Sequence, residues 1–317
     1  MKQHWSEYWK QGHLTSFGSD FERNYAGILR DVWFPIFDGL KPGFEVLDVA
    51  TGNGAIPLLI RDYLGQSNIN GRVRGIDYAE IHTSINEHDG QIAIDLIGGV
   101  NCESIPFEAQ VDLVTSQFGI EYSNVTESLV QISNILKIGG RISLVCHHSD
   151  SVIMVRNKRI LAIVQNGLVA ELIDNLHLLV EAMGDIFDKS DLQRLKEDAI
   201  CEKLRMKVNH QLGELVAIDQ SALQDSEILN YVMTFFKKGM FWSVKDKKNY
   251  LKFVQQQINN LGLRLTELIN AALDVPKLAG MATLLSSVGV RLSSISTLKT
   301  DDHQIIAWHL VFDKLVK

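Results

Sequence analysis

The sequence of 317 residues predicts an α/β fold built on a seven-stranded, mostly parallel β-sheet. Short apolar runs rich in β-branched residues alternate with helical patterns, as expected when each strand is followed by a helix that returns the chain to the same edge. The last two runs are separated only by a short turn, which predicts a terminal antiparallel hairpin. Strong helical periodicity without strand signals also predicts a helical cap over residues 1–43 and a long helical insertion over 151–287.

The first strand and the turn after it form the most informative segment. An apolar run over 44–49 leads into a turn of small residues, and a helical pattern follows. This turn contains Asp48, Ala50, Thr51, Gly52, Asn53 and Gly54. Glycine tolerates positive φ and has no Cβ, so such a turn lets a ligand approach the backbone at the carboxyl edge of a parallel sheet. The carboxylate of Asp48 suits a cationic ligand group; the alternative is that it only caps the turn.

The next strands place further polar residues at the same edge. A second strand over 71–77 ends at Asp77, which lies 25 positions after Gly52. That is near the spacing of about 20 at which nucleotide-binding folds place a carboxylate for ribose hydroxyls. A segment from Asn101 precedes a fourth strand over 111–118, and a fifth strand covers 142–146.

The end of the chain returns to the sheet after the insertion. The run 290–296 predicts a sixth strand and the run 305–312 a seventh. Asp301 and Asp302 lie in the turn between them, and so short a turn makes the two strands antiparallel.

This ordered set of strands and turns resembles the class I S-adenosylmethionine-dependent methyltransferases over about 44–150 and the last thirty residues. The resemblance implies a Rossmann-like domain formed by 44–150 and 288–317, with the seventh strand beside the fifth. It implies S-adenosyl-L-methionine as the cofactor. The positions that it assigns to cofactor binding are Asp48, Ala50, Thr51, Gly52, Asn53, Gly54, Asp77, Tyr78, Asn101, Cys102, Glu103, Gln117 and Phe118.

The chain departs from the family pattern at three positions. Ala50 stands where glycine is usual, Asn101 where aspartate is common, and Ile138 where proline precedes two glycines. The turn after the first strand also lacks the third glycine of the GxGxxG pattern, whose helix faces a pyrophosphate. A cofactor without phosphate is compatible with such a turn.

Candidate catalytic residues follow the fourth and fifth strands. They are Tyr122, His147 and His148. In methyl transfer the cofactor supplies the electrophile, while the protein aligns the nucleophile and, for some substrates, removes a proton. A histidine with an ordinary pKa near 6.5 is suited to that task. The alternatives to a histidine base are that His148 bonds a loop carbonyl and that His147 points to solvent. A third alternative is that the reaction proceeds by proximity without a base.

Composition favours a cytoplasmic enzyme that acts on a small molecule. A net charge of −7 disfavours a broad nucleic-acid footprint, and no apolar run of membrane-spanning length or signal-peptide type is present. The three cysteines lack the paired spacing of a zinc site, so no metal is expected. The motif of nucleic-acid amino-methylating enzymes is absent after the fourth strand, which favours a small-molecule acceptor.

The cap and the insertion are the expected substrate walls. Trp5, Tyr8 and Trp9 share one helix face, which is typical of core packing and also of an aromatic lid. The insertion could close the active site, line a pocket for an apolar substrate, or pair two copies as a homodimer. The alternative function is a catalytically silent scaffold that keeps the fold and acts through its helical insertion.

Overall fold

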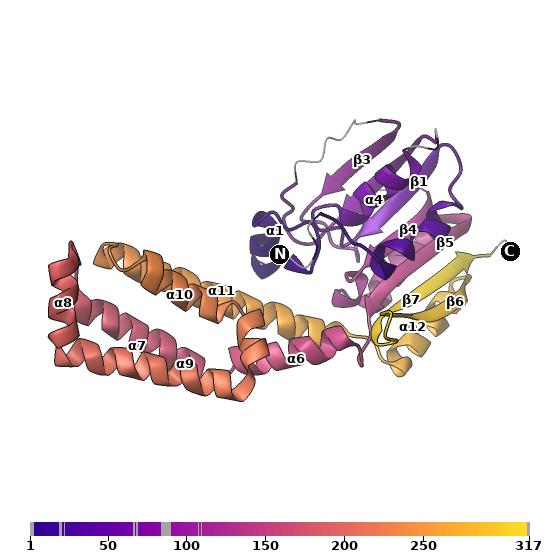
Figure 1. The fold of residues 1–317 in the computed structure, drawn as a ribbon. Coiled ribbons are helices and arrows are strands. Elements are labelled where there is room, and N and C mark those ends of the chain that lie inside the picture. Colours follow the sequence, from indigo (N-terminus) through magenta and orange to yellow (C-terminus); the bar gives the residue numbers. More distant parts are fainter. Residues whose placement is uncertain are drawn as a thin grey trace. The chain divides into compact units, whose positions relative to one another are not determined.

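The computed structural model describes residues 3–18, 21, 23–65, 67, 69–83, 90–106, 108 and 110–315. The chain forms two compact units (Figure 1). Residues 1–154 and 267–317 form the sheet unit, and residues 155–266 form the helical unit. None of the described helices is long and apolar enough to cross a membrane.

The sheet unit contains one seven-stranded sheet in the order β3-β2-β1-β4-β5-β7-β6. Its strands are β1 Phe44–Val49, β2 Gly71–Ile76, β3 Ile92–Ile97, β4 Val111–Gln117, β5 Leu136–His147, β6 Val290–Lys299 and β7 Ile305–Lys314. Strands β1 to β5 are parallel to one another. Strand β7 runs antiparallel to both β5 and β6. The predicted Rossmann-like fold and its terminal hairpin are therefore confirmed.

Strand β5 begins six residues earlier than the sequence indicates. Val111 pairs with Leu136 and Leu113 pairs with Arg141, so the intervening residues bulge out of the ladder. Gly139 allows the bulge because its φ of 78° is unfavourable for other residues. The segment that the sequence predicts as a turn before the strand is thus a bulge within it.

Two helical layers cover the sheet, and alternate residues of each strand face one or the other. Val46 and Val73 pack with helices α2 (Ile28–Asp31), α3 (Phe34–Phe37) and α4 (Ala55–Leu64). Leu47 and Val114 pack on the opposite side with α5 (Val125–Ile135) and α12 (Val275–Ser287). Helix α12 lies within the range predicted as insertion but packs in the sheet unit.

The amino-terminal helix α1 (Gln3–Lys10) packs separately from both layers. Tyr8 and Trp9 are buried against Ala79, and Trp5 packs at the edge of this small cluster. The first part of the predicted cap is therefore a short helix at the end of β2, whereas α2 and α3 belong to the main core.

The helical unit is built around a core of its own. Its helices are α6 Val152–Val164, α7 Gly167–Met183, α8 Lys189–Glu197, α9 Ala199–Asp225, α10 Ile228–Lys238 and α11 Val244–Ala271, of which α6 and α11 continue into the sheet unit. The helical pattern of residues 161–183 is divided between α6 and α7 at Asn166, whose side chain caps α7. The side chain of Asp188 caps α8.

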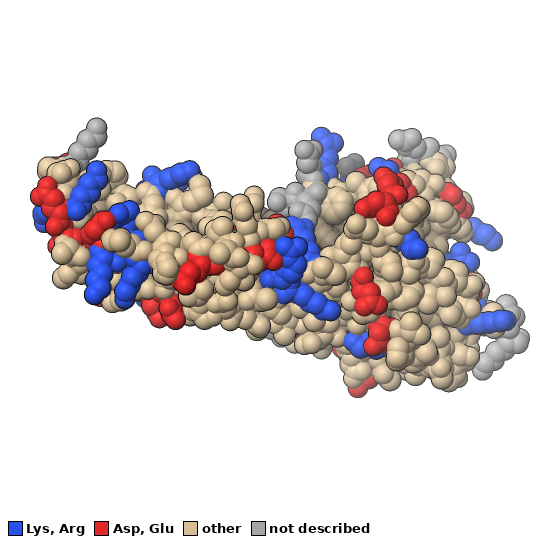
Figure 2. Space-filling model, turned by 60° about the horizontal axis from the view of Figure 1, so that its bottom comes forward, with Lys and Arg blue, Asp and Glu red and all other residues tan. Residues whose placement is uncertain are grey.

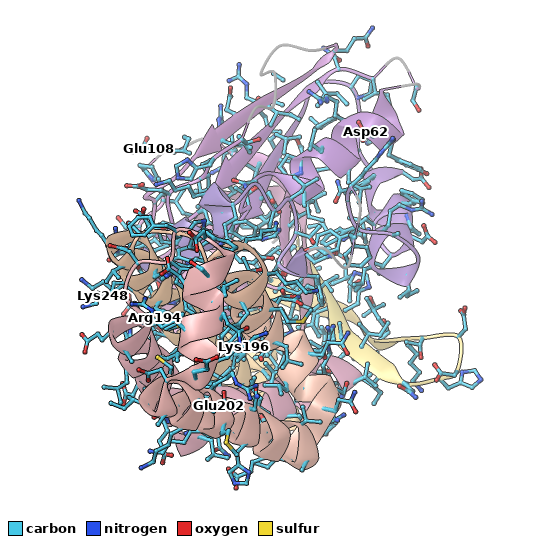
Figure 3. The ribbon with its side chains drawn as sticks, turned by 60° about the vertical axis from the view of Figure 1, so that its left-hand side comes forward. Asp62, Glu108, Arg194, Lys196, Glu202 and Lys248 are labelled. Carbon is cyan, nitrogen blue, oxygen red and sulfur yellow. The ribbon has the colours of Figure 1, made fainter. Side chains whose placement is uncertain are left out.

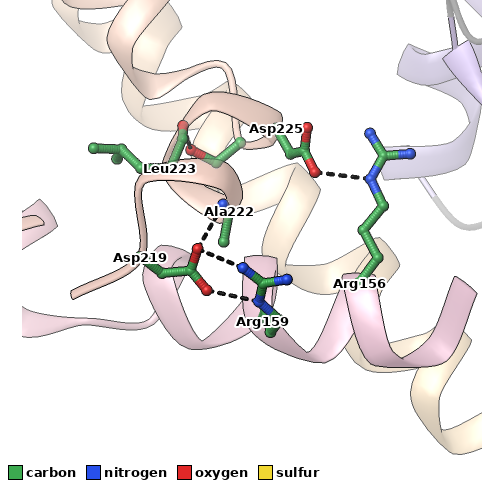
Figure 4. Close-up of polar contacts among 7 residues, drawn as sticks. Arg156, Arg159, Asp219, Ala222, Leu223 and Asp225 are labelled. Carbon is green, nitrogen blue, oxygen red and sulfur yellow. Dashed lines mark hydrogen bonds and ion pairs between the residues drawn. The ribbon is translucent and has the colours of Figure 1, made fainter. Parts of the chain in front are cut away.

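Helix α9 contains a kink at Asp219, where φ is −162° and ψ is 94°. The carboxylate of Asp219 accepts hydrogen bonds from the backbone of Ala222 at 3.0 Å and from Arg159 at 2.7 and 2.8 Å (Figure 4). Arg156 donates to Asp225 at 2.8 Å in the same region. The guanidinium of Arg159 lowers the pKa of Asp219 to about 2, so the kink is fixed by a charged pair above that pH.

The surface of the helical unit carries charges of both signs. Arg194, Lys196, Glu202 and Lys248 all lie on this unit (Figure 3). Lysine, arginine and acidic side chains are mixed on the face that Figure 2 shows rather than gathered by sign.

Candidate functional site

A cavity of about 450 Å³ lies at the carboxyl edge of the sheet. Its walls come from the residues that follow β1, β2 and β4, from the segment at Asn101, and from the cap. All described residues that line it belong to the sheet unit. The location is the one at which open α/β sheets bind ligands.

Asp48 lies at the base of this cavity and is almost completely buried. Its Oδ1 atom accepts a hydrogen bond of 2.7 Å from the hydroxyl of Thr115 on the neighbouring strand β4. Burial raises the pKa of the Asp48 carboxyl to about 7, because the charged form loses its hydration. Because a buried carboxyl without a cation favours its protonated form, a positively charged group beside Asp48 would stabilise the carboxylate.

The backbone is strained where β1 and β4 end beside each other. Ala50 and Phe118 both adopt left-handed conformations, with φ of 56° and 54°. A Cβ on Gly119 would lie only 2.4 Å from Cβ of Ala50, so the two turns are in direct contact. Such conformations persist where surrounding structure holds them, and they cluster at functional sites.

Asp77 connects the second strand to the glycine turn. One oxygen accepts a hydrogen bond of 2.8 Å from the backbone of Gly52, and the other accepts one of 2.8 Å from the backbone of Ala79. Asp77 and the partly exposed Tyr78 both line the cavity. The two predicted polar positions after β1 and β2 are thus brought together.

The predicted adenine-side residues Asn101, Cys102 and Glu103 also line the cavity. Glu103 accepts a hydrogen bond of 2.8 Å from the backbone of Asn124. The thiol of Cys102 lies 3.3 Å from the hydroxyl of Ser128, and burial raises its pKa. This end of the cavity therefore offers an amide, a neutral thiol and a carboxylate.

Three predicted cofactor residues, Gly52, Asn53 and Gly54, do not line the cavity, and the cap contacts the first two of them. The indole of Trp9 lies against Gly52. The side-chain amide of Asn53 donates to the backbone oxygens of Trp9 and His13, at 2.9 and 2.8 Å. Gly54, also absent from the wall, begins α4 with a φ of 92°. The glycine turn is therefore tied directly to the cap.

Cap residues form a large part of the cavity wall. Trp5, Trp9, Leu14, Ser16 and Tyr25 all line it. The aromatic members were expected from the sequence as a possible lid, whereas nothing in the sequence singled out Ser16. Glu267 near the end of α11 holds this cap, because one of its oxygens accepts hydrogen bonds of 2.9 Å from both His4 and Trp5.

Of the predicted catalytic residues, Tyr122 lines the cavity and the two histidines lie behind its wall. The hydroxyl of Tyr122 is 3.1 Å from Nε2 of His147. The ring of Phe118 stacks on His147 with centroids 4.5 Å apart, and burial lowers the pKa of His147 to about 3. His148 stacks on Trp308 with centroids 4.2 Å apart. Neither histidine points to solvent.

A buried glutamate supports the same region. Glu121 accepts a hydrogen bond of 2.8 Å from the backbone of His147, and burial raises the pKa of its carboxyl to about 7. It lies beside the site without lining the cavity.

Comparison with protein families identifies the chain. The sequence profile of the ubiE/COQ5 methyltransferase family matches residues 29–221, which is more than half of the sequence. The chain belongs to this family. The cofactor of these methyltransferases is S-adenosylmethionine, so the cofactor predicted from the sequence is confirmed. A comparison with curated proteins gives no significant match.

Several solved methyltransferases are similar to this family member. A 1,6-didemethyltoxoflavin-N1-methyltransferase of Burkholderia thailandensis, with bound S-adenosylhomocysteine, is 10% identical with a TM-score of 0.47, covering 99% of this chain and 87% of that chain. Phosphoethanolamine N-methyltransferase 2 of Haemonchus contortus, in complex with S-adenosyl-L-methionine, is 12% identical with a TM-score of 0.36. The match covers 95% of this chain and 55% of that chain. A methyltransferase of Haloferax volcanii, in complex with the Trm112 activator, is 20% identical with a TM-score of 0.31. The match covers 40% of this chain and 57% of that chain. The family member thus spans just over half the length of the last two proteins.

The described residues of this methyltransferase fit the family cofactor. Asp48 offers a buried anion, and three wall residues carry buried polar atoms. These atoms are Oγ of Ser16, Oγ1 of Thr51 and Nε2 of Gln117. The side chains of Ser16 and Gln117 also interact with Tyr25, and that of Thr51 with Asp48, so these polar atoms are compatible with a ligand without requiring one.

Proposed function

We propose that this protein transfers a methyl group from S-adenosylmethionine to a small-molecule acceptor bound in the cavity. The observation that carries the proposal is the small cavity at the carboxyl edge of the sheet, with Asp48 at its base and the cap in its wall. Its volume of about 450 Å³ lies within the range of about 300–1,000 Å³ that is typical of small-molecule sites.

The proposed cofactor contacts follow the family pattern. Asp48 binds the amino group, Asp77 and Tyr78 bind the ribose, and Asn101, Cys102 and Glu103 surround the adenine. The turn formed by Ala50, Thr51, Gly52, Asn53 and Gly54 shapes the backbone beside the cofactor, and Gln117 and Phe118 lie at the end of β4. Gly52, Asn53 and Gly54 act from beneath the cap rather than from the wall.

The cofactor supplies the electrophilic methyl group when bound, and the protein supplies alignment and exclusion of water. Tyr122 presents a protonated hydroxyl at the wall, because burial raises its pKa well above the ordinary value of 10. His147 stays uncharged behind it and does not line the cavity. These properties support proximity and a neutral hydrogen bond, rather than a histidine base, as the means of catalysis.

We further assign closure of the cavity to the cap of residues 1–43. The insertion predicted over 151–287 takes part through Glu267, which holds His4 and Trp5 in place. The remaining helices of the insertion pack around a core of their own, and we assign them no role in the reaction.

Calorimetric titration of the ligand-free protein with S-adenosylmethionine and S-adenosylhomocysteine tests the function. We expect binding by the native protein and a loss of at least about tenfold for Asp77→Asn, because the amide nitrogen of asparagine cannot accept one of the two backbone hydrogen bonds from Gly52 and Ala79 and the ribose contact loses its charge. Transfer of a labelled methyl group to pooled small metabolites then identifies the acceptor. A folded protein that binds neither compound would favour the scaffold function.

A further inference from the structure

The second half of the helical unit is strongly basic. From the start of α10 to the end of the unit, residues 228–266 contain seven lysine or arginine residues and one acidic residue, Asp246, which gives a net charge of +6. Residues 155–227 of the same unit contain nine basic and thirteen acidic residues, and the whole chain has a net charge of −7. The positive charge is therefore concentrated on α10, on α11 and on the turn between them.

Helices α10 and α11 lie side by side and are joined by a turn over residues 239–243 (Figure 1). The hydroxyl of Tyr250 on α11 donates to the backbone oxygen of Tyr231 on α10 at 2.9 Å. The ring of Phe253 meets that of Tyr231 edge-on, with centroids 6.3 Å apart. The two helices thus form a packed hairpin with the turn at its end.

Six of the seven basic residues of this hairpin are lysines. Lys247 is buried and donates to the backbone oxygen of Gly184 at 3.1 Å, whereas Lys248 pairs with Glu181 at 3.0 Å. The other four are exposed and form no ion pair among the described residues. They are Lys237, Lys238, Lys245 and Lys252. An anionic partner can therefore approach these four cations without displacing an acidic side chain.

Exposed apolar side chains accompany these lysines. Phe241 in the turn is 56% exposed, and Phe253 on α11 is 49% exposed. Phe187, at 83%, has the largest exposed fraction among the large apolar side chains that the structure describes. Its segment lies beside the start of α11, because the carboxylate of Asp185 accepts a hydrogen bond of 2.7 Å from the backbone of Val244. Burial of these rings against a partner would remove apolar surface from water.

This combination of residues favours a lipid surface over other anionic partners. Lysine carries its charge on a long apolar stem, which suits anionic headgroups, and phenylalanine enters the boundary between headgroups and acyl chains. Recognition of nucleic-acid bases and phosphates relies heavily on arginine, but the only arginine of residues 228–266 is the partly buried Arg264. Pairing of two copies hairpin to hairpin is opposed by the charge of +6 on each.

We propose that the end of the helical unit at which α10 meets α11 docks on a membrane surface that contains anionic lipid. The four exposed lysines attract the headgroups, and Phe187 and Phe241 enter the interface. The contact is peripheral, with the hairpin lying on the surface rather than crossing it. Docking of this kind is separate from the cofactor cavity and goes beyond the proposed methyl transfer.

Sedimentation of the full-length protein with lipid vesicles tests the docking. We would compare vesicles of phosphatidylcholine alone with vesicles that also contain about 30% phosphatidylserine, which supplies the negative surface potential. The native protein should bind only the anionic vesicles, and binding should weaken as salt rises from about 50 to about 500 mM, because salt screens the lysines. Replacing all four exposed lysines by glutamine should weaken binding at least about 50-fold, since each lysine near such a surface contributes about fivefold.

A matched variant removes the same charge from another part of the same unit. It replaces four exposed lysines outside the hairpin by glutamine, namely Lys158, Lys196, Lys203 and Lys207. This control should change vesicle binding by less than about threefold, because these lysines lie beyond the Debye length of about 10 Å from a docked surface.

The apolar contribution is tested separately. Phe187→Ser combined with Phe241→Ser should weaken binding to anionic vesicles about 10- to 100-fold, as expected for loss of two buried rings. The salt dependence should stay as in the native protein, because burial of apolar surface is not screened. All the substituted side chains are exposed, so each variant should keep the native helical circular-dichroism signal.

Four results would overturn the lipid assignment. Two of them are failure of the native protein to bind anionic vesicles, and equal losses in the hairpin and control lysine variants. A third is tighter binding of a single-stranded RNA oligonucleotide that depends on the lysines but not on the phenylalanines, which would assign the hairpin to nucleic acid. The fourth is dimerisation without lipid that the phenylalanine variant abolishes, which would assign this end to a second copy. Titration with S-adenosylmethionine tests the proposed function independently, since no residue substituted here lines the cavity.

Discussion

The indole of Trp9 packs directly on the backbone of Gly52, where a Cβ would lie 2.6 Å from Cζ2 of the ring. Gly52 also has a φ of 54°, so a side chain there is disfavoured twice. We predict that Gly52→Ala lowers the free energy of unfolding by about 2–4 kcal/mol, from backbone strain and displacement of Trp9. Chemical denaturation measures this. Gly139→Ala, at a φ of 78° with open space around it, is the matched control and should cost only about 1–2 kcal/mol.

Ala50 stands in a left-handed conformation that glycine adopts without strain. We predict that Ala50→Gly stabilises the protein by up to about 1 kcal/mol, because relief of strain exceeds the greater freedom of the unfolded chain. Thermal unfolding is the measurement. Ala55→Gly in helix α4 should destabilise instead, by about 1 kcal/mol. A loss of stability in Ala50→Gly would show that contact of the Ala50 methyl group with Gly119 outweighs the strain.

Asp48 should make the ligand-free protein less stable as pH rises from about 4 to 7, against the opposite contributions of the buried His147 and His309. Burial raises the pKa of Asp48 from 3.8 to about 7, so between these values the folded protein binds a proton that the unfolded chain has released. The contribution is lost as pH rises through this window and amounts to a few kcal/mol, on the order of 1.4 per unit of pKa. Asp48→Asn should remove it, being more stable than native at pH 8 and similar at pH 4.

Denaturation curves across this pH range test the Asp48 prediction. Glu121, whose pKa is also raised to about 7, titrates in the same direction, so the combined Asp48→Asn and Glu121→Gln variant should differ most from the native profile and keep only the rise with pH that His147 and His309 cause. The same Asp48→Asn variant should bind S-adenosylmethionine poorly. A pH profile identical to that of the native protein would contradict the burial of an ionisable carboxyl at this position.

Glu267 should control the local stability of the cap. Glu267→Ala removes the acceptor shared by His4 and Trp5, so we expect α1 to exchange its amide hydrogens about fivefold faster. Hydrogen–deuterium exchange with mass spectrometry resolves this peptide. Glu181→Ala, which breaks an ion pair with Lys248 in the helical unit, should leave exchange in α1 unchanged.

His147 should remain uncharged at every pH at which an ordinary histidine titrates. Burial lowers its pKa from 6.5 to about 3, so the group contributes stability above pH 6.5 that is lost as pH falls toward 3. The ring signals of His147 in NMR spectra, identified by their absence in His147→Gln, should not shift between pH 8 and 5. A midpoint near 6.5 would restore His147 as a candidate base.

The sheet could be predicted because its signals are local. Glycine turns, β-branched runs and the turn near Asp301 predict strands and the terminal hairpin, whereas the range of β3 and the order of the parallel strands were not predicted. Asp48 and Asp77 were identified for the same reason, since each directly follows a strand. The contacts of Glu267 with His4 and of Gln117 with Trp33 join residues 263 and 84 positions apart. The periodicity of apolar residues in a sequence cannot predict such pairs, because only tertiary packing brings them together.

The histidines show a second limit of the sequence. The sequence places His147 and His148 at the end of the fifth strand, but it does not reveal that Phe118 and Trp308 cover their rings. Whether a titratable group faces a cavity depends on side-chain packing, and so does its pKa.

The chain that leaves β5 and the chain that returns from α11 meet in a short bridge between His148 and Leu273. Leu273 donates its backbone N–H to His147 at 2.8 Å and accepts from Ser149 at 3.0 Å and from the indole of Trp308 at 3.0 Å. Both ends of the excursion are thus fastened to the sheet at one point. Because the excursion leaves and re-enters the sheet unit at one point, a change of length within residues 155–266 is compatible with an unchanged order of strands.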